Sequence, residues 1–182
     1  QALRLQNNDA ANYNTAVGYN AGGAVTTGIH NTLIGGLAGD ALTDADKNVA
    51  IGYNALTADT LGSRSVAIGV GTLGTQNFTT ATSAYNVGVG HNAGSVITTG
   101  IHNTLIGGQA GDALTDADDN VAVGLNALTT DTLGSKSTAI GRAALASQNF
   151  TTATDSHNTA VGYFAGVSVT TGVQNTLIGS LA

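Results

Sequence analysis

The chain has 182 residues and a formal net charge of −6, and only 9% of its residues are charged, against about 25% in an average soluble domain. The acidic balance argues against nucleic acid as a partner, because binding it requires a basic face. No apolar run approaches the ~20 residues of a membrane-spanning helix, so we expect no membrane insertion. The chain contains no cysteine, which excludes a disulfide framework.

A five-residue signature recurs ten times along the chain. It reads Asn or Ser, then Thr or Val, a residue that is usually small, Val or Ile, and Gly. The copies begin at Asn14, Asn31, Asn48, Ser65, Asn86, Asn103, Asn120, Ser137, Asn158 and Asn175. A fixed period of this size predicts a stacked solenoid.

The spacing of the signatures defines a longer repeat. Successive signature glycines are separated by 17, 17, 17 and 21 residues, and this series then starts again. Residues 14–85 and 86–157 are therefore 72-residue super-repeats, identical at 51 of 72 positions, and residues 158–182 begin a third. We accordingly divide the chain into a lead-in segment, 1–13, and one continuous repeat array, 14–182.

Each signature predicts a short strand followed by a turn. Successive side chains alternate between the two faces, so Thr15 and Val17 point one way while Asn14 and Ala16 point the other. β-Branched residues favour extended backbone, and Gly18 permits a positive φ or a close backbone approach. The third residue after the Gly is Ala in nine coils and Thr72 in the tenth, which indicates a crowded position.

Parallel, in-register stacking would place about ten coils along roughly 48 Å. The Asn/Ser positions would then form a row of hydrogen bonds along the stack. The fourth signature position would form a continuous aliphatic row, which we predict to be the structural core: Val17, Ile34, Ile51, Ile68, Val89, Ile106, Val123, Ile140, Val161 and Ile178.

The apolar content of one coil is small for a free-standing roll. Ordering a coil of 17 residues costs roughly 25 kcal/mol at about 1.5 kcal/mol per residue. Offsetting this cost takes on the order of 1,000 Å² of apolar burial. One Val or Ile, one Ala and one or two further aliphatic residues fall short of that area. We therefore expect several chains to associate, with closed symmetry favouring a trimer or a dimer.

The repeats resemble those of two known families. Ser65 to Gly69 and Asn48 to Gly52 are similar to the head repeat of trimeric autotransporter adhesins, and Asn14 to Gly22 resembles repeats of phage tail-fibre proteins. The resemblance covers the array from about Asn12 onward. It implies a left-handed parallel β-roll, a homotrimeric fibre, an extracellular location on a virion or a cell surface, and a role in attachment. The coils of 17 and 21 residues are longer than the usual autotransporter coil.

The two 21-residue coils carry the candidate receptor-contact loops. They contain Asn77, Phe78 and Thr79 and, 72 residues later, Asn149, Phe150 and Thr151. A Phe in such a loop either docks a surface glycan or a protein receptor, or covers the roll and packs on a neighbour, and we favour covering. Both triplets also match the glycosylation sequon.

The acidic loops between coils offer a weak calcium alternative. Asp44 and Asp46, with their equivalents Asp116 and Asp118, carry the oxygen ligands that a hard cation prefers. They lack the spacing of known calcium loops, and turn formation explains them equally well. We assign no metal site and expect no cofactor. His30 and His102 are equivalent, one super-repeat apart, and His91 and His157 replace Tyr19 and Tyr85, which is typical of surface packing.

The array thus predicts an all-β parallel solenoid that holds or attaches and performs no catalysis. An inert structural filament without a receptor is the main alternative. Two minor alternatives are a left-handed β-helix acyltransferase, which would need three hexads per coil, and an ice-binding solenoid suggested by pairs such as Thr26-Thr27. These pairs recur only every fourth coil.

Overall fold

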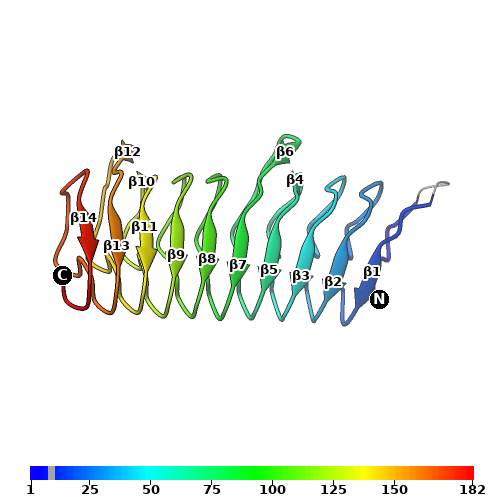
Figure 1. Cartoon of the computed structure of the whole chain (residues 1–182). Coiled ribbons are helices and arrows are strands. Elements are labelled where there is room, and N and C mark those ends of the chain that lie inside the picture. The colour runs from blue at the N-terminus through cyan, green and yellow to red at the C-terminus, as the bar shows by residue number, and fades with distance from the viewer. Residues whose placement is uncertain (8–10) are drawn as a thin grey trace.

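A computed structural model of the chain, which describes residues 1–7 and 11–182, is an all-β parallel solenoid (Figure 1). Ten short strands of the described residues form one parallel sheet along the roll, in the order β1-β2-β3-β5-β7-β8-β9-β11-β13-β14. The coils succeed one another along a single axis, with the two termini at opposite ends (Figure 1). No helix in the described part of the chain is long and apolar enough to cross a membrane.

Each strand of the main sheet covers the middle three residues of one signature. Their bounds are β1 Thr15–Val17, β2 Thr32–Ile34, β3 Val49–Ile51, β5 Val66–Ile68, β7 Val87–Val89, β8 Thr104–Ile106, β9 Val121–Val123, β11 Thr138–Ile140, β13 Thr159–Val161 and β14 Thr176–Ile178. Two smaller parallel pairs join β4 (Gly62–Ser63) to β6 (Thr82–Ser83), and β10 (Gly134–Ser135) to β12 (Thr154–Asp155). The predicted strand in every signature is confirmed.

The coils stack in register, as the period predicts. Val17 pairs with Ile34, Ile34 with Ile51, and Ile51 with Ile68, and the same correspondence continues to Ile178. Like residues therefore form columns parallel to the axis. The coarse prediction of a parallel β-solenoid of about ten coils is confirmed.

The prediction that the Val/Ile column is the core is wrong. These residues form a continuous row, but on the outer face of the sheet: Val17 is 59% exposed, Ile68 36% and Ile178 71%. Ile34, Ile106 and Ile140 are also exposed, while Ile51, Val89, Val123 and Val161 are half-buried. The residue between the two β-branched positions fills the interior instead, as Leu33, Ala50, Ala67, Leu105 and Ala122 do with no exposed surface.

The Asn/Ser column explains why the faces are arranged this way. In each Asn coil except the last, the side-chain oxygen accepts a hydrogen bond from the backbone N–H of the next coil, for example from Asn31 N to Asn14 Oδ1 (2.7 Å). Its Nδ2 donates across the roll to the carbonyl fourteen residues later, as in Asn31 to Ala45 O (2.8 Å). The column must therefore point inward, and a residue three positions later must point outward. The predicted row of hydrogen bonds is present, although backbone groups are the main partners.

The signature glycines bring neighbouring coils into backbone contact. Gly35 has φ +135°, and a Cβ placed there would overlap the carbonyl oxygen of Gly52 and lie 2.7 Å from its carbonyl carbon. The same overlap recurs at each signature Gly from Gly18 to Gly162. Only glycine therefore fits this column.

The crowded position three residues after the glycine lies in the core. Ala21, Ala38, Ala55, Thr72 and Ala93 have no exposed surface. The four alanines pack with inward-facing leucines such as Leu56 and Leu73 into one continuous core cluster. The interior is narrow, because each coil contributes only a few small or branched side chains to it.

The predicted lead-in segment already follows the path of the roll in its first seven residues. Leu3 N donates to Ala21 O (3.0 Å) and Asn7 N to Thr26 O (3.3 Å). These bonds match those of Leu73 and Asn77 in the first long coil. Leu3 also packs against the core cluster.

Candidate functional site

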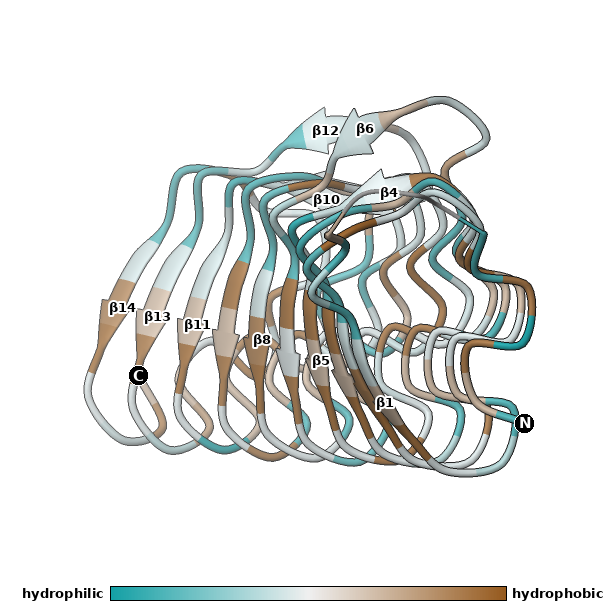
Figure 2. Cartoon of the chain, turned by 90° about the vertical axis from the view of Figure 1, so that its right-hand side faces the viewer, coloured by the Kyte–Doolittle hydropathy of each residue, from teal (hydrophilic) through white to brown (hydrophobic). Residues whose placement is uncertain are grey.

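The two 21-residue coils project from the same edge of the roll (Figures 1 and 2). In each long coil the four extra residues extend the chain beyond the preceding coil, which carries β4 or β10. The long coil then returns through β6 or β12, which pairs with that strand. Asn77, Thr79 and Thr80 are exposed in the first loop. Asn149, Thr151 and Thr152 are their exposed equivalents in the second. Four coil steps separate the loops, which corresponds to about 19 Å along the axis.

Phe78 and Phe150 do not offer their rings to a partner. Each side chain is only 6% exposed. A Cβ on Gly62 would lie 2.7 Å from the ring of Phe78, so the ring packs on the bare backbone of Gly62. The backbone of Phe78 is also held, because its N–H donates to Asp59 Oδ1 (3.1 Å) and its carbonyl accepts from Leu61 N (3.1 Å). Phe78 therefore anchors the loop, and the exposed groups left for recognition are Asn77, Thr79 and their equivalents.

A buried polar network lies beneath each projecting loop. Gln76 Nε2 donates to Asp59 Oδ2 (2.6 Å) and to Ser65 Oγ (3.0 Å), and Gln76 Oε1 accepts from Asn86 Nδ2 (2.9 Å). All four residues have no exposed surface. Burial raises the pKa of the Asp59 carboxyl, although hydrogen bonds from Gln76, Phe78 and Gly62 act in the opposite direction.

The second long coil repeats this network. Gln148 Nε2 donates to Asp131 Oδ2 (2.5 Å) and Ser137 Oγ (2.8 Å), and its Oε1 accepts from Asn158 Nδ2 (2.8 Å). Ser occupies the Asn column only in these two coils, and the Gln amide fills the space that the shorter side chain leaves. Our sequence reasoning missed this network. The sequence did contain a signal for it. The two coils that begin with Ser instead of Asn, at Ser65 and Ser137, are also the two 21-residue coils, and each of them carries a Gln.

The structure gives the calcium alternative no support. Asp44 Oδ1 accepts from Thr27 Oγ1 (2.6 Å) and Asp46 Oδ1 from Ile29 N (2.8 Å). Asp116 and Asp118 repeat both bonds with Thr99 and Ile101. Among the described residues, no three His, Cys, Asp or Glu side chains gather in a group able to hold a metal ion. The carboxylates instead bind the preceding coil.

The threonine pairs belong to a column that the sequence reading did not recognise. Thr26, Thr43 and Thr60 lie on successive coils, and so do Thr98, Thr115 and Thr132. The pairs themselves recur every fourth coil, but the first Thr of a pair has Thr counterparts on the next two coils. The hydroxyl groups of this column donate to carbonyl groups of the next coil, for example from Thr43 Oγ1 to Thr60 O (3.1 Å). They stabilise the stack.

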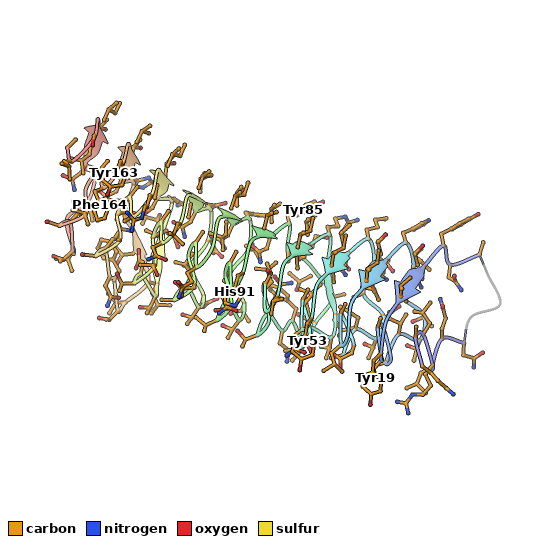
Figure 3. The ribbon with its side chains drawn as sticks, turned by 90° about the horizontal axis from the view of Figure 1, so that it is seen from below. Tyr19, Tyr53, Tyr85, His91, Tyr163 and Phe164 are labelled. Carbon is orange, nitrogen blue, oxygen red and sulfur yellow. The ribbon has the colours of Figure 1, made fainter. Side chains whose placement is uncertain are left out.

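The outer face of the main sheet is an exposed apolar surface. It consists of the Val/Ile column and the Thr/Val column beside it, which is half-buried except at its exposed ends, Thr15 and Thr176. Figure 2 shows hydrophobic colouring along its strands. We call these two columns the aliphatic face. Tyr19 (77% exposed), Tyr53 (55%), Val70, Leu125 and Tyr163 extend it on the side of the turn. Figure 3 shows Tyr19, Tyr53, His91 and Tyr163 following one another along the roll.

Comparisons of the chain with protein-family models, with curated proteins and with solved structures each return no match.

Proposed function

We propose that this chain is a segment of an extracellular, homotrimeric fibre that serves attachment. In this proposal the roll is a stiff shaft that performs no catalysis, and the projecting loops of the long coils display Asn77, Thr79, Asn149 and Thr151 to a surface glycan or protein. The resemblance to adhesin and tail-fibre repeats adds a left-handed coil and three chains around a common axis.

The exposure of the aliphatic face is the observation that carries this proposal. Together with the adjoining Tyr19 column, it covers an area about 48 Å long, from ten coils at about 4.8 Å each, and about 13 Å wide, from four residue rises of about 3.3 Å. Part of this area is polar, since Thr15, His91 and Arg142 lie in it, but exposed apolar patches of a few hundred Å² often mark interaction surfaces. A second or third copy offers the same face with the same coil spacing, so association would cover it along its whole length.

The oligomeric state tests the shaft. We expect light scattering after gel filtration to give three times the chain mass of 17.9 kDa. The double substitution I68K/I106K places two charges on the aliphatic face and should give a monomer that keeps its β-sheet circular dichroism spectrum. The matched control T152K adds a charge at a loop tip and should stay trimeric. A wild-type chain that is monomeric at tens of micromolar would refute the fibre.

Binding separates attachment from an inert filament. A labelled wild-type trimer is applied to a glycan array and to intact bacterial and animal cells. The loop variant N77A/T79A/N149A/T151A serves as the comparison. Retention of the wild type with loss of the variant would support display by the loops. A trimer that binds no surface would favour the inert shaft.

A further inference from the structure

The residue immediately before each signature forms a second exposed column on the roll, which we call the pre-signature column. Its members, one per coil, are Tyr13, His30, Lys47, Arg64, Tyr85, His102, Asp119, Lys136, His157 and Gln174. All ten are exposed. They lie beside the aliphatic face, on the side opposite the Tyr19 column, and Figure 3 shows Tyr85 across the roll from Tyr19 and Tyr53.

The composition of this column differs sharply from that of the chain. The whole chain has 17 aromatic, histidine, lysine and arginine residues, from five Lys and Arg, four His, five Tyr and three Phe. Eight of them occupy these ten positions. Such a concentration of rings and cations in one column points to a role for those side chains outside the roll.

The backbone of the column makes this choice of residues costly. All ten residues have positive φ, between 50° and 64°, where Gly, Asn, Asp and His are favoured and other bulky side chains are strained. The column that begins at Asn20 has the same backbone and serves as an internal comparison. It uses Asn or Gly at five of ten positions: Asn20, Asn54, Gly71, Asn92 and Asn126. The pre-signature column has favoured residues at four of ten positions, His30, His102, Asp119 and His157. Within the segment from Tyr13 to His102, however, Tyr13, Lys47, Arg64 and Tyr85 are held against local preference, which is typical of functional sites.

Neighbouring side chains in the column contact one another along the axis. The rings of Tyr13 and His30 are stacked, with centroids 5.3 Å apart and planes 2° apart. The guanidinium of Arg64 lies 5.6 Å from the ring centroid of Tyr85, which lies 6.0 Å from that of His102. From Tyr13 to His102 the order is ring, ring, cation, cation, ring, ring, over a length of about 24 Å.

Acidic groups divide the column into two parts. Lys136 is already paired with Asp155 (2.5 Å), and His102 Nδ1 lies 3.2 Å from Asp119 Oδ1. Asp46 adjoins Lys47 in sequence, but its Oδ1 accepts a hydrogen bond from the amide of Ile29. Arg64 donates to the neutral hydroxyl of Ser83. The cations available to an anionic ligand are therefore Lys47 and Arg64, with rings on both sides of them.

We propose that the segment of this column from Tyr13 to His102 binds an acidic polysaccharide that lies along the roll axis. The apolar C–H face of a sugar packs on an aromatic ring, whose face carries partial negative charge. Lys47 and Arg64 would pair with carboxylate or sulfate groups between these stacked sugars. A single-stranded nucleic acid is the competing polyanion, because its bases also stack on aromatic rings, and it forms a separate arm of the test. The proposal deepens the attachment role and rests on it.

The test measures binding of the full chain to defined polymers by isothermal titration calorimetry. The probes are polygalacturonate for carboxylates, dextran sulfate for sulfates, neutral dextran, and a 20-nucleotide thymidine oligonucleotide. We expect an acidic polysaccharide to bind and neutral dextran to bind at least tenfold more weakly. The double substitution K47Q/R64Q should weaken acidic binding about tenfold, since exposed ion pairs contribute up to about fivefold each. R142Q removes an exposed cation outside the column and should leave binding unchanged.

The variant Y85N separates binding from folding. Asn is better suited than Tyr to this backbone conformation, so Y85N should unfold at the same or a higher temperature while binding more weakly. Absence of acidic-polymer binding, equal binding of dextran, or wild-type affinity in both K47Q/R64Q and Y85N would overturn the proposal. Tighter binding of the oligonucleotide would replace it with nucleic acid. Light scattering on the same samples reports the trimer independently, so a monomer that still binds acidic polymer would refute only the fibre.

Discussion

Replacing Gly35 with Ala tests whether backbone contact between coils sets the stability of the roll. Gly35 has φ +135°, and its Cα faces the carbonyl group of Gly52 on the next coil. An added Cβ would overlap that oxygen and lie 2.7 Å from the carbonyl carbon. Both partners are backbone, so no side chain can rotate to relieve the contact.

The expected loss has two parts. Holding a non-glycine residue at this φ costs about 1–3 kcal/mol. Relieving the overlap needs a separation of roughly 1 Å, which would stretch the hydrogen bonds from Gly35 N to Val17 O (2.7 Å) and from Gly52 N to Ile34 O (2.8 Å) beyond useful length. Losing these two bonds costs about 1 kcal/mol each. The free energy of unfolding should therefore fall by about 3–5 kcal/mol, which lowers Tm by about 6–20 °C in a chain of this size.

The adjacent residue is the matched control. Gly36 does not have positive φ, and a Cβ there would meet only the Tyr53 ring, at an ordinary 3.4 Å. G36A should therefore change the free energy of unfolding by less than about 1 kcal/mol. Urea and thermal denaturation followed by circular dichroism measure both variants. If G35A and G36A are equally stable, neighbouring coils are not in backbone contact at this column, and the packing argument fails.

Three further outcomes are expected from the long coils. Q76A removes one hydrogen bond each from Asp59, Ser65 and Asn86, so it should lower the free energy of unfolding, measured in urea, by about 3 kcal/mol. An equal loss in the exposed control Q109A would contradict the network. F78A should lower the free energy of unfolding by about 3 kcal/mol and open its loop to cleavage by proteinase K, whereas the control T79A should do neither. A loop that stays protected from cleavage in F78A would show that Phe78 does not anchor it. Because burial raises the pKa of Asp59, the folded chain binds this proton before the unfolded chain does as pH falls. The wild type should therefore gain stability relative to D59N from pH 7 down to about pH 4, and a relative loss in the urea midpoint would contradict the raised pKa.

The period of the sequence was sufficient to predict the stack. Ten signatures in phase fix which residues lie above one another, and the pairing of Val17 with Ile34 and of Ile34 with Ile51 follows directly. The same signatures predict ten short parallel strands, because the alternation of β-branched residues and the closing glycine repeat in every coil. A repeat of this kind leaves only one in-register arrangement for equivalent residues.

The inside and the outside of the roll were not determined by that pattern. Alternation shows that Asn14 and Val17 face opposite ways, but hydrophobicity alone places Val17 inside, and the structure places it outside at 59% exposure. The deciding contacts join groups 14 and 17 residues apart, where the Asn31 amide bonds Ala45 O and the Asn14 oxygen accepts from Asn31 N. Only the closed coil brings those groups together.

The candidate sites were also determined partly by the sequence and partly by the tertiary structure. Sequence spacing located the two 21-residue coils, and their loops do project, but the tertiary structure buries Phe78 on Gly62 and joins Gln76 to Asp59 beneath it. The pre-signature column is legible in the sequence as one residue per coil. Its positive φ and its exposure emerge only when each coil closes and turns the chain into the next strand. Sequence therefore determined which residues share a column, and tertiary structure decided which columns face the core and which face a partner, because that depends on hydrogen bonds closed across the coil.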